Sequence, residues 1–402
     1  MSATLTSDCS GCNGGALYLS LELGWNKWVL GFTSGLGDKL WKRTIAARDL
    51  LKFHELIGRA KQRLGLAADA PVRSCYEAGR DGFWLHRHLE GQGIVNLVVD
   101  SASIEVNRRQ RRSKTDALDV AKLGTMLCRW WLGEKQVWSV VRVPTLAQED
   151  QRQLHRELGM LKGEQTRHVN RVRAYLACQG IALPSVTAGL PKLLPTLHLP
   201  DGRLLSEACP QLCQRVLREH DRLERVREQI AELEKQRDRV IREGKAPAAA
   251  PARKLMRLRG IGAASAYALA QELEGRGSFT RRQLGGLAGL CPSKYQSGDS
   301  DHDRGISKAG NRRLRTLMVE LGWSWVRFQG GSVLTQWFVR RFAGGGKRLR
   351  KIGIVGLARK LLIALWRYLS SGQEPPGAVA GDWRAKFSHK ARPAAAGAVA
   401  AG

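Results

Sequence analysis

The sequence predicts an α/β layer fold over residues 1–143, followed by a helical arm and a mainly α C-terminal region. Three observations lead to this prediction. Short apolar strands alternate with helices up to about residue 143, two long and highly charged helical stretches lie within residues 144–244, and helices separated by Gly- and Pro-containing turns follow from residue 253. An alternation of strands and helices is typical of a sheet covered by helices.

The N-terminal elements follow one another in a regular order. Residues 16–33 (ALYLSLELGWNKWVLGFT) predict two strands around a Gly-containing turn, and a helix is expected from about Ala46 to Leu64. The stretch PVRSCYEAG predicts a strand that ends in an acid, and DGFWLHRHLEGQG predicts the next helix. The apolar strand IVNLVVD and a last helix, starting at Asp116, complete this region.

Four carboxylates are expected to converge at one edge of this sheet. Glu22 and Glu77 each end a strand, while Asp116 and Asp119 share one helix face because positions i and i+3 are neighbours. Carboxylates so close together repel one another unless a positive charge lies between them. Magnesium, or manganese, is the expected counter-ion, since hard cations bind carboxylate oxygen and keep sites open for phosphate and water.

Five cations directly precede these aspartates. They are Arg108, Arg109, Arg111, Arg112 and Lys114. They are expected to bind the phosphodiester backbone delivered to the metal. From the residues alone, the arginines themselves could also neutralise the carboxylates, and Asp116 could simply cap a helix.

The middle of the chain predicts a coiled-coil helical arm over residues 144–244. Leu217, Leu223, Ile230, Leu233 and Val240 form a rough heptad-like stripe in its second helix. The stretch GKAPAAAPA then predicts a linker over residues 245–252.

Residues 253–372 predict a third, mainly helical region that contacts nucleic acid. Gly260 and Gly262 precede an Ala-rich helix, as in a helix-hairpin-helix element whose backbone N–H groups approach a phosphate. A polar loop carries Ser297, and Lys308, Arg312 and Arg313 surround the start of a basic helix. The tail of residues 373–402, rich in Ala, Gly and Pro, is expected to be disordered.

Composition narrows the choice of partners. The 402-residue chain has a formal net charge of +30 and a pI near 10.5, which favours nucleic acid as the partner. Neither a signal peptide nor a membrane-spanning segment stands out, so a cytosolic protein associated with the nucleoid is expected.

Four segments together resemble a known family. YEAGRDGFW, RRSKTDALDVAKL, LRGIGAASA and CPSKYQSGDSDHDRGISKAGNRRLR are similar to segments of the transposases of insertion-sequence family 110, also called DEDD transposases, and occur in the same order. This resemblance implies a RuvC-like (ribonuclease H-fold) N-terminal domain, a coiled-coil arm and a C-terminal transposase domain with a catalytic serine. It also implies a recombinase guided by a structured bridge RNA.

The family's acidic tetrad falls on Glu22, Glu77, Asp116 and Asp119, and its serine falls on Ser297. Glu22 departs from the pattern, because the family usually has Asp there. The implied activity is cutting and rejoining of double-stranded DNA, at element ends and target, through a magnesium-assisted phosphoserine intermediate. A homo-oligomer, dimer or tetramer, is implied as well.

Two other interpretations stay open at this point. One is a metal-dependent nuclease of RuvC type that uses water as nucleophile. The other is a nucleic-acid-binding protein disabled at Glu22.

Overall fold

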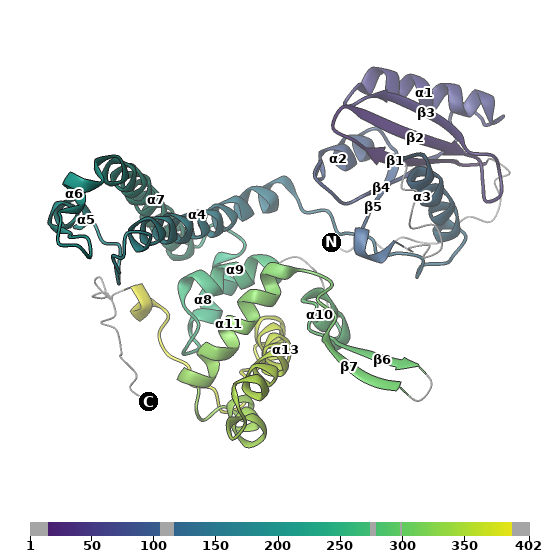
Figure 1. Cartoon of the computed structure of the whole chain (residues 1–402). Helices are drawn as coiled ribbons and strands as arrows, with labels where there is room; N and C mark the ends of the chain where they lie inside the picture. Colours follow the sequence, from purple (N-terminus) through teal and green to yellow (C-terminus); the bar gives the residue numbers. More distant parts are fainter. Residues whose placement is uncertain (1–14, 105–115, 274–278, 298–299, 388–402) are drawn as a thin grey trace. The chain divides into compact units, whose positions relative to one another are not determined.

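The computed structural model describes residues 15–104, 116–273, 279–297 and 300–387 (Figure 1). The chain divides into two compact units, Met1–Pro144 and Thr145–Gly402. Each unit has its own hydrophobic core. They are described separately below.

The first unit is built on a five-stranded sheet in the order β3-β2-β1-β4-β5. The strands are β1 (Leu17–Leu23), β2 (Lys27–Thr33), β3 (Trp41–Ala46), β4 (Val72–Glu77) and β5 (Val95–Val99). β1, β2 and β3 pair antiparallel, whereas β1, β4 and β5 pair parallel. The C-terminal ends of β1, β3, β4 and β5 therefore lie along the same edge of the sheet.

Helices cover both faces of this sheet. Helices α1 (Leu50–Arg63) and α2 (Trp84–Gly91) pack on the face that carries Leu17, Leu19 and Leu21. Helix α3 (Asp116–Trp131) packs on the opposite face, against Cys75 and Val99. The alternation of side chains along each strand separates these two cores, as the period of two requires. A short 3-10 turn, η1 (Ser101–Ser103), follows β5.

The predicted mixed α/β character of the N-terminal region is confirmed, but one strand was missed. β3 lies where no element was expected, and the helix expected from Ala46 begins at Leu50 behind the cap Asp49, whose side chain accepts a hydrogen bond from the Lys52 amide. β3 is an edge strand with exposed Lys42, Arg43 and Thr44. Charged side chains are common on edge strands, so the apolar pattern of a strand is absent there.

Two long antiparallel helices open the second unit. They are α4 (Leu146–Ala177) and α7 (Pro210–Glu243), joined through the short helices α5 (Leu190–Leu193), η3 (Leu194–Thr196) and α6 (Leu205–Ala208). A capping box between Thr145 and Gln148 starts α4, and Gly244, with φ of 73°, ends α7. Leu158, Leu161, Val226 and Ile230 pack between the two long helices.

The rest of the second unit is mainly helical, as predicted. Its elements are α8 (Ala249–Met256), α9 (Ala263–Leu273), α10 (Arg281–Leu287), β6 (Pro292–Ser297), β7 (Ser300–Ile306), α11 (Arg312–Phe328), α12 (Val333–Phe338), η4 (Val339–Ala343), α13 (Lys347–Ser371) and η5 (Arg384–Phe387). Side chains of α8, α9, α11 and α13, together with Ile241 of α7, share one hydrophobic core.

The structure differs from expectation at residues 245–252. Instead of a linker there, α8 begins at Ala249, and Ala248, Ala249 and Ala252 are fully buried in the core. Alanine has a high helix propensity and its small side chain allows close packing, so an Ala-rich stretch with two prolines can still form a core helix.

The expected disordered tail differs as well. The Pro376 carbonyl accepts a hydrogen bond from the Val333 amide, and the Gly381 amide donates to the Arg257 carbonyl. Trp383 and Phe387 pack against the core. The described part of the tail, up to residue 387, is therefore tied to the helices, and residues 388–402 lie outside the described residues. Within the parts of the chain that are described, no helix is long and apolar enough to cross a membrane.

Candidate active site

Glu22 and Glu77 occupy equivalent places on neighbouring parallel strands. The register of β1 and β4 pairs Tyr18 with Arg73 and Leu21 with Tyr76, so one further residue brings Glu22 opposite Glu77. Residues in register on adjacent strands point to the same face of a sheet. For Tyr18 and Arg73 this is visible directly, because the Arg73 guanidinium donates to the Tyr18 hydroxyl at 3.0 Å. Glu22 and Glu77 therefore share the face that α3 covers.

Helix α3 is held on this face by polar contacts as well as apolar ones. The Ser20 hydroxyl donates to the Val120 carbonyl at 2.8 Å, and the Arg73 guanidinium lies 4.0 Å from the centre of the Trp131 ring. Gly31 permits the close approach, since a Cβ at that position would lie 2.4 Å from Val120 Cγ1.

These contacts fix the direction of α3. Trp131, at the end of α3, lies near Arg73, early in β4, whereas Val120, near its beginning, lies near Ser20 in the middle of β1. The helix therefore starts at the edge where β1 and β4 end. The ion pair between Lys27 Nζ and Asp116 Oδ2, at 3.6 Å, agrees with this direction, because Lys27 begins β2 at the same edge.

The four predicted carboxylates thus come from backbone positions at one edge, but their side chains do not gather. Glu77 and Asp116 are exposed, and Glu22 and Asp119 are half-buried. Among the described residues, no group of three or more His, Cys, Asp or Glu side chains is arranged to hold a metal ion. The exposed ion pair between Asp116 and Lys27 contributes little energy. The donor chemistry and the backbone placement suit a hard divalent cation, and the ligand set remains a prediction.

Ser297 belongs to the second unit and ends β6. Its backbone pairs with that of Ser300, the first residue of β7. The side chains of residues 294–304, like the predicted basic run of Arg108, Arg109, Arg111, Arg112 and Lys114, lie outside the described residues.

The two glycines of the predicted phosphate-binding turn have different surroundings. Gly260 has φ of +86°, and a Cβ there would lie 3.2 Å from the Ser324 carbonyl oxygen and from Phe328 Cβ. The Ser324 hydroxyl donates to the Gly260 carbonyl at 2.6 Å. Gly260 is therefore required for packing against α11. Gly262 has open space around the position of a Cβ, so of the two it is the one a ligand can approach.

The predicted cations of the third region lie at the start of α11. Arg312 and Arg313 are exposed in its first turn, and Lys308, also exposed, has φ of +55°. Asn311, which the sequence analysis did not single out, caps the helix by accepting hydrogen bonds from the amides of Arg313 and Leu314. Cations beside a helix N-terminus are unfavourable unless an anion binds there, because the dipole is positive at that end.

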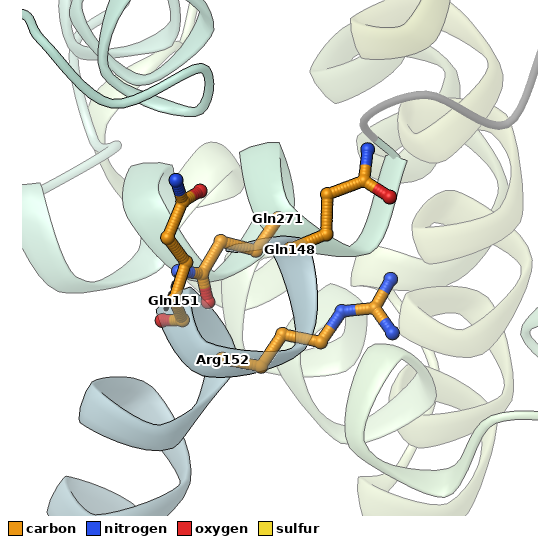
Figure 2. A pocket seen from close by; sticks show the side chains of 4 residues that line it. All are labelled: Gln148, Gln151, Arg152 and Gln271. Atoms are coloured by element: carbon orange, nitrogen blue, oxygen red, sulfur yellow. Dashed lines mark hydrogen bonds between the residues drawn. The ribbon is translucent and has the colours of Figure 1, made fainter. Parts of the chain in front are cut away.

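A polar depression in the second unit is lined by three glutamines and one arginine, with no carboxylate or other metal-binding side chain among its lining residues. It is lined by Gln148, Gln151 and Arg152 of α4 and by Gln271 of α9 (Figure 2). Gln271 Nε2 donates to the Gln151 carbonyl at 2.7 Å, and the depression is too shallow to enclose a water molecule. It marks where α4 joins α9.

Known transposases resemble this chain, one of them over most of its length. The protein y4rJ of Sinorhizobium fredii (strain NBRC 101917 / NGR234), named as a transposase, is 40% identical over 380 residues, 91% of this chain and 94% of the relative. The transposase for insertion sequence element IS1328 of Yersinia enterocolitica is 30% identical over 170 residues, which are 42% of this chain and 47% of the relative. The family model described as "Transposase IS116/IS110/IS902 family" matches residues 252–337. The chain therefore belongs to the IS110 family of insertion-sequence transposases.

Proposed function

We propose that this transposase cuts and rejoins DNA strands by attack of Ser297 on a phosphodiester, at a site completed by the four carboxylates of the first unit. The observation that carries the proposal is the register of β1 and β4. It brings Glu22 and Glu77 side by side on the face where α3 starts with Asp116 and Asp119.

The topology of the first unit supports a RuvC-like fold. Three antiparallel strands continue into parallel strands in the order β3-β2-β1-β4-β5, with helices on both faces. In this arrangement β1 and β4 would supply Glu22 and Glu77 as acidic ligands, and α3 would supply Asp116 and Asp119.

Glu22, Glu77, Asp116 and Asp119 would hold Mg²⁺, with Mn²⁺ as the alternative. When bound, the ion supplies a Lewis acid that stabilises charge on the phosphoryl and leaving oxygens. Ser297 Oγ forms the new bond to phosphorus, its proton passes to solvent or a nearby base, and the sugar oxygen leaves. The phosphoserine link keeps the bond energy for rejoining. Because the serine and the carboxylates belong to different units of the chain, a composite site in a homo-oligomer, dimer or tetramer, fits this division.

Exposed cations of the second unit supply a surface for double-stranded DNA and a structured bridge RNA. Two lie within η4 and four at the start of α13: Arg340, Arg341, Lys347, Arg348, Arg350 and Lys351. No acidic residue lies in the first turn of α13. Such a concentration of cations at a helix N-terminus favours a polyanion.

A covalent-trapping assay tests the proposal. The protein, with RNA transcribed from the DNA flanking its gene, is incubated with labelled element-end DNA and magnesium and then run on a denaturing gel. We expect a protein–DNA adduct in the wild type and none in Ser297→Ala or Asp119→Ala. Cleavage without an adduct that survives Ser297→Ala would replace the recombinase by a water-using nuclease. If the wild type binds DNA without any reaction and Glu22→Asp restores the reaction, the disabled binding protein is favoured.

A further inference from the structure

Trp25 is an unusually exposed aromatic residue. It lies in the turn between β1 and β2, three residues after Glu22, with 62% of its surface exposed. The turn is closed by a hydrogen bond from the Gly24 amide to the Lys27 carbonyl at 3.0 Å. An exposed tryptophan on an ordered turn leaves a large apolar ring in water, which a packing role does not explain.

Two arginines lie close to this ring, most of which stays exposed. The guanidinium carbons of Arg48 and Arg80 each lie 5.1 Å from the centre of the Trp25 ring. Asp81, whose side chain is only 6% exposed, holds both guanidinium groups, at 3.3 Å from Arg48 and 3.4 Å from Arg80. A buried carboxylate thus fixes the two cations, and cation–π attraction orients them against the indole. Both arginines are about half exposed, so their other N–H groups can reach a ligand.

The backbone around Arg48 is held in a costly conformation. Its φ is +68°, in a region that non-glycine residues rarely adopt. The neighbouring Ala47 amide donates to the Asn26 carbonyl at 3.0 Å and fastens this loop to the turn of Trp25. Strain of this kind persists where the surroundings fix it, and it clusters at functional sites.

This group lies at the edge that carries the carboxylates. Trp25 follows β1, Arg48 follows β3, and Arg80 follows Glu77 at the end of β4 by three residues. All three strands end at the same edge, where Lys27 also pairs with Asp116.

We propose that Trp25, Arg48 and Arg80 form a shelf that binds an unpaired nucleotide of the DNA strand beside the phosphodiester to be cut. The indole stacks on the base, and the two guanidinium groups contact the flanking phosphates. An aromatic surface beside arginines is the combination by which proteins bind single strands, because every base has a stacking face. The proposal rests on the proposed function, since it takes the carboxylate edge as the site of strand cutting.

The test measures binding of the full-length chain to fluorescein-labelled strands by anisotropy. The probes are a thymidine strand, an abasic strand of equal length, a uridine RNA strand and a DNA duplex. Raised salt suppresses the non-specific attraction of a strongly basic protein for phosphates. We expect Trp25→Ala to weaken binding of the thymidine strand about tenfold and to leave the abasic strand and the duplex unchanged. Trp25→Phe should recover most of the loss, because it keeps a stacking ring.

Leu132→Ala is the matched control. Leu132 is 70% exposed and directly follows α3, at the end opposite to Asp116. The Leu132→Ala variant should bind every probe with the same affinity as the wild type. Equal weakening on the thymidine and abasic strands, or no weakening at all, would overturn the stacking role. A loss confined to RNA would overturn the assignment to the DNA strand.

The trapping assay separates this inference from the proposed function. If Ser297→Ala loses the adduct while Trp25→Ala binds all probes normally, the strand-cutting mechanism stands and the shelf does not. If Trp25→Ala shows the base-dependent loss but no adduct forms in the wild type, the nucleotide site stands and the serine mechanism fails.

Discussion

Acidic residues have opposite surroundings at the sheet edge of the first unit and in the helical pair of the second. At the edge, Asp116 pairs with Lys27 at 3.6 Å, and both side chains are more than half exposed. On α7, the Glu219 side chain is 4% exposed and is held by His168 at 2.8 Å and by Arg171 at 3.0 Å, both from α4. Arg222, on α7 itself, contacts its other oxygen at 2.9 Å.

This difference separates a structural carboxylate from carboxylates suited to bind a ligand. Burial by itself would raise the pKa of Glu219, but the hydrogen bonds from Arg171, His168 and Arg222 lower it to about 2. Such a group is already satisfied by the protein and joins α4 to α7. At the edge, by contrast, Glu77 and Asp116 are exposed to solvent.

The largest expected effect concerns the edge. If Asp119 is a metal ligand as proposed, Asp119→Asn should raise the barrier by about 3 kcal/mol and so lower strand cutting about a hundredfold. The free energy of unfolding should change by no more than about 0.5 kcal/mol. Adduct formation and urea unfolding measure the two quantities. Asp69→Asn, an exposed aspartate before β4 at the opposite edge, is the control. A folding defect in Asp119→Asn without loss of activity would show that Asp119, like Glu219, has a structural role.

The second effect concerns the helical pair. Glu219→Gln should lower the free energy of unfolding by about 1.5–3 kcal/mol, because the buried side chain loses its charge-assisted hydrogen bonds with His168, Arg171 and Arg222. Urea unfolding followed by circular dichroism gives the value. Glu228→Gln on the same helix removes an exposed pair with Arg225 and should cost no more than about 1 kcal/mol. Similar values for the two variants would show that Glu219 does not stabilise the pair.

The stabilisation by Glu219 should depend on pH. Because the pKa of Glu219 is lowered from its ordinary value of 4.5 to about 2, its contribution is fully present above about pH 4.5 and is lost as the pH falls towards 2. The difference in unfolding free energy between wild type and Glu219→Gln should therefore be constant near neutral pH and shrink below about pH 4.5. A difference that stays constant down to pH 3 would contradict the ion cluster as its source.

The smallest expected effect is a difference in stability between two glycine variants, one at a packed position and one at an open position. Gly260→Ala should cost about 1–3 kcal/mol, because Gly260 has positive φ and lies against Ser324 and Phe328. Gly262→Ala should change stability by no more than about 0.5 kcal/mol, since the space around it is open. Thermal unfolding measures both. Equal stability of the two variants would show that the turn tolerates a side chain at either position.

Local pattern determined much of this protein in advance. The alternation of Leu17, Leu19 and Leu21 with polar residues predicts β1, and the apolar spacing after Asp116 predicts the helix that carries Asp116 and Asp119. Leu223 and Ile230 of the predicted heptad stripe are indeed buried on α7. Neighbouring residues determine such features, because side-chain periodicity and helix capping act over a few positions.

Tertiary structure alone decided the features that depend on distant partners. Sequence periodicity could not show that β3 pairs with β2 as an edge strand, or that Ala252 belongs to the hydrophobic core. It also could not show that Glu219 accepts hydrogen bonds from side chains about fifty residues away in the sequence. Likewise, Trp25 meets Arg48 and Arg80 only because three strands end at one edge. Burial and electrostatic pairing depend on which surfaces meet in space, so the pattern of one segment cannot report them.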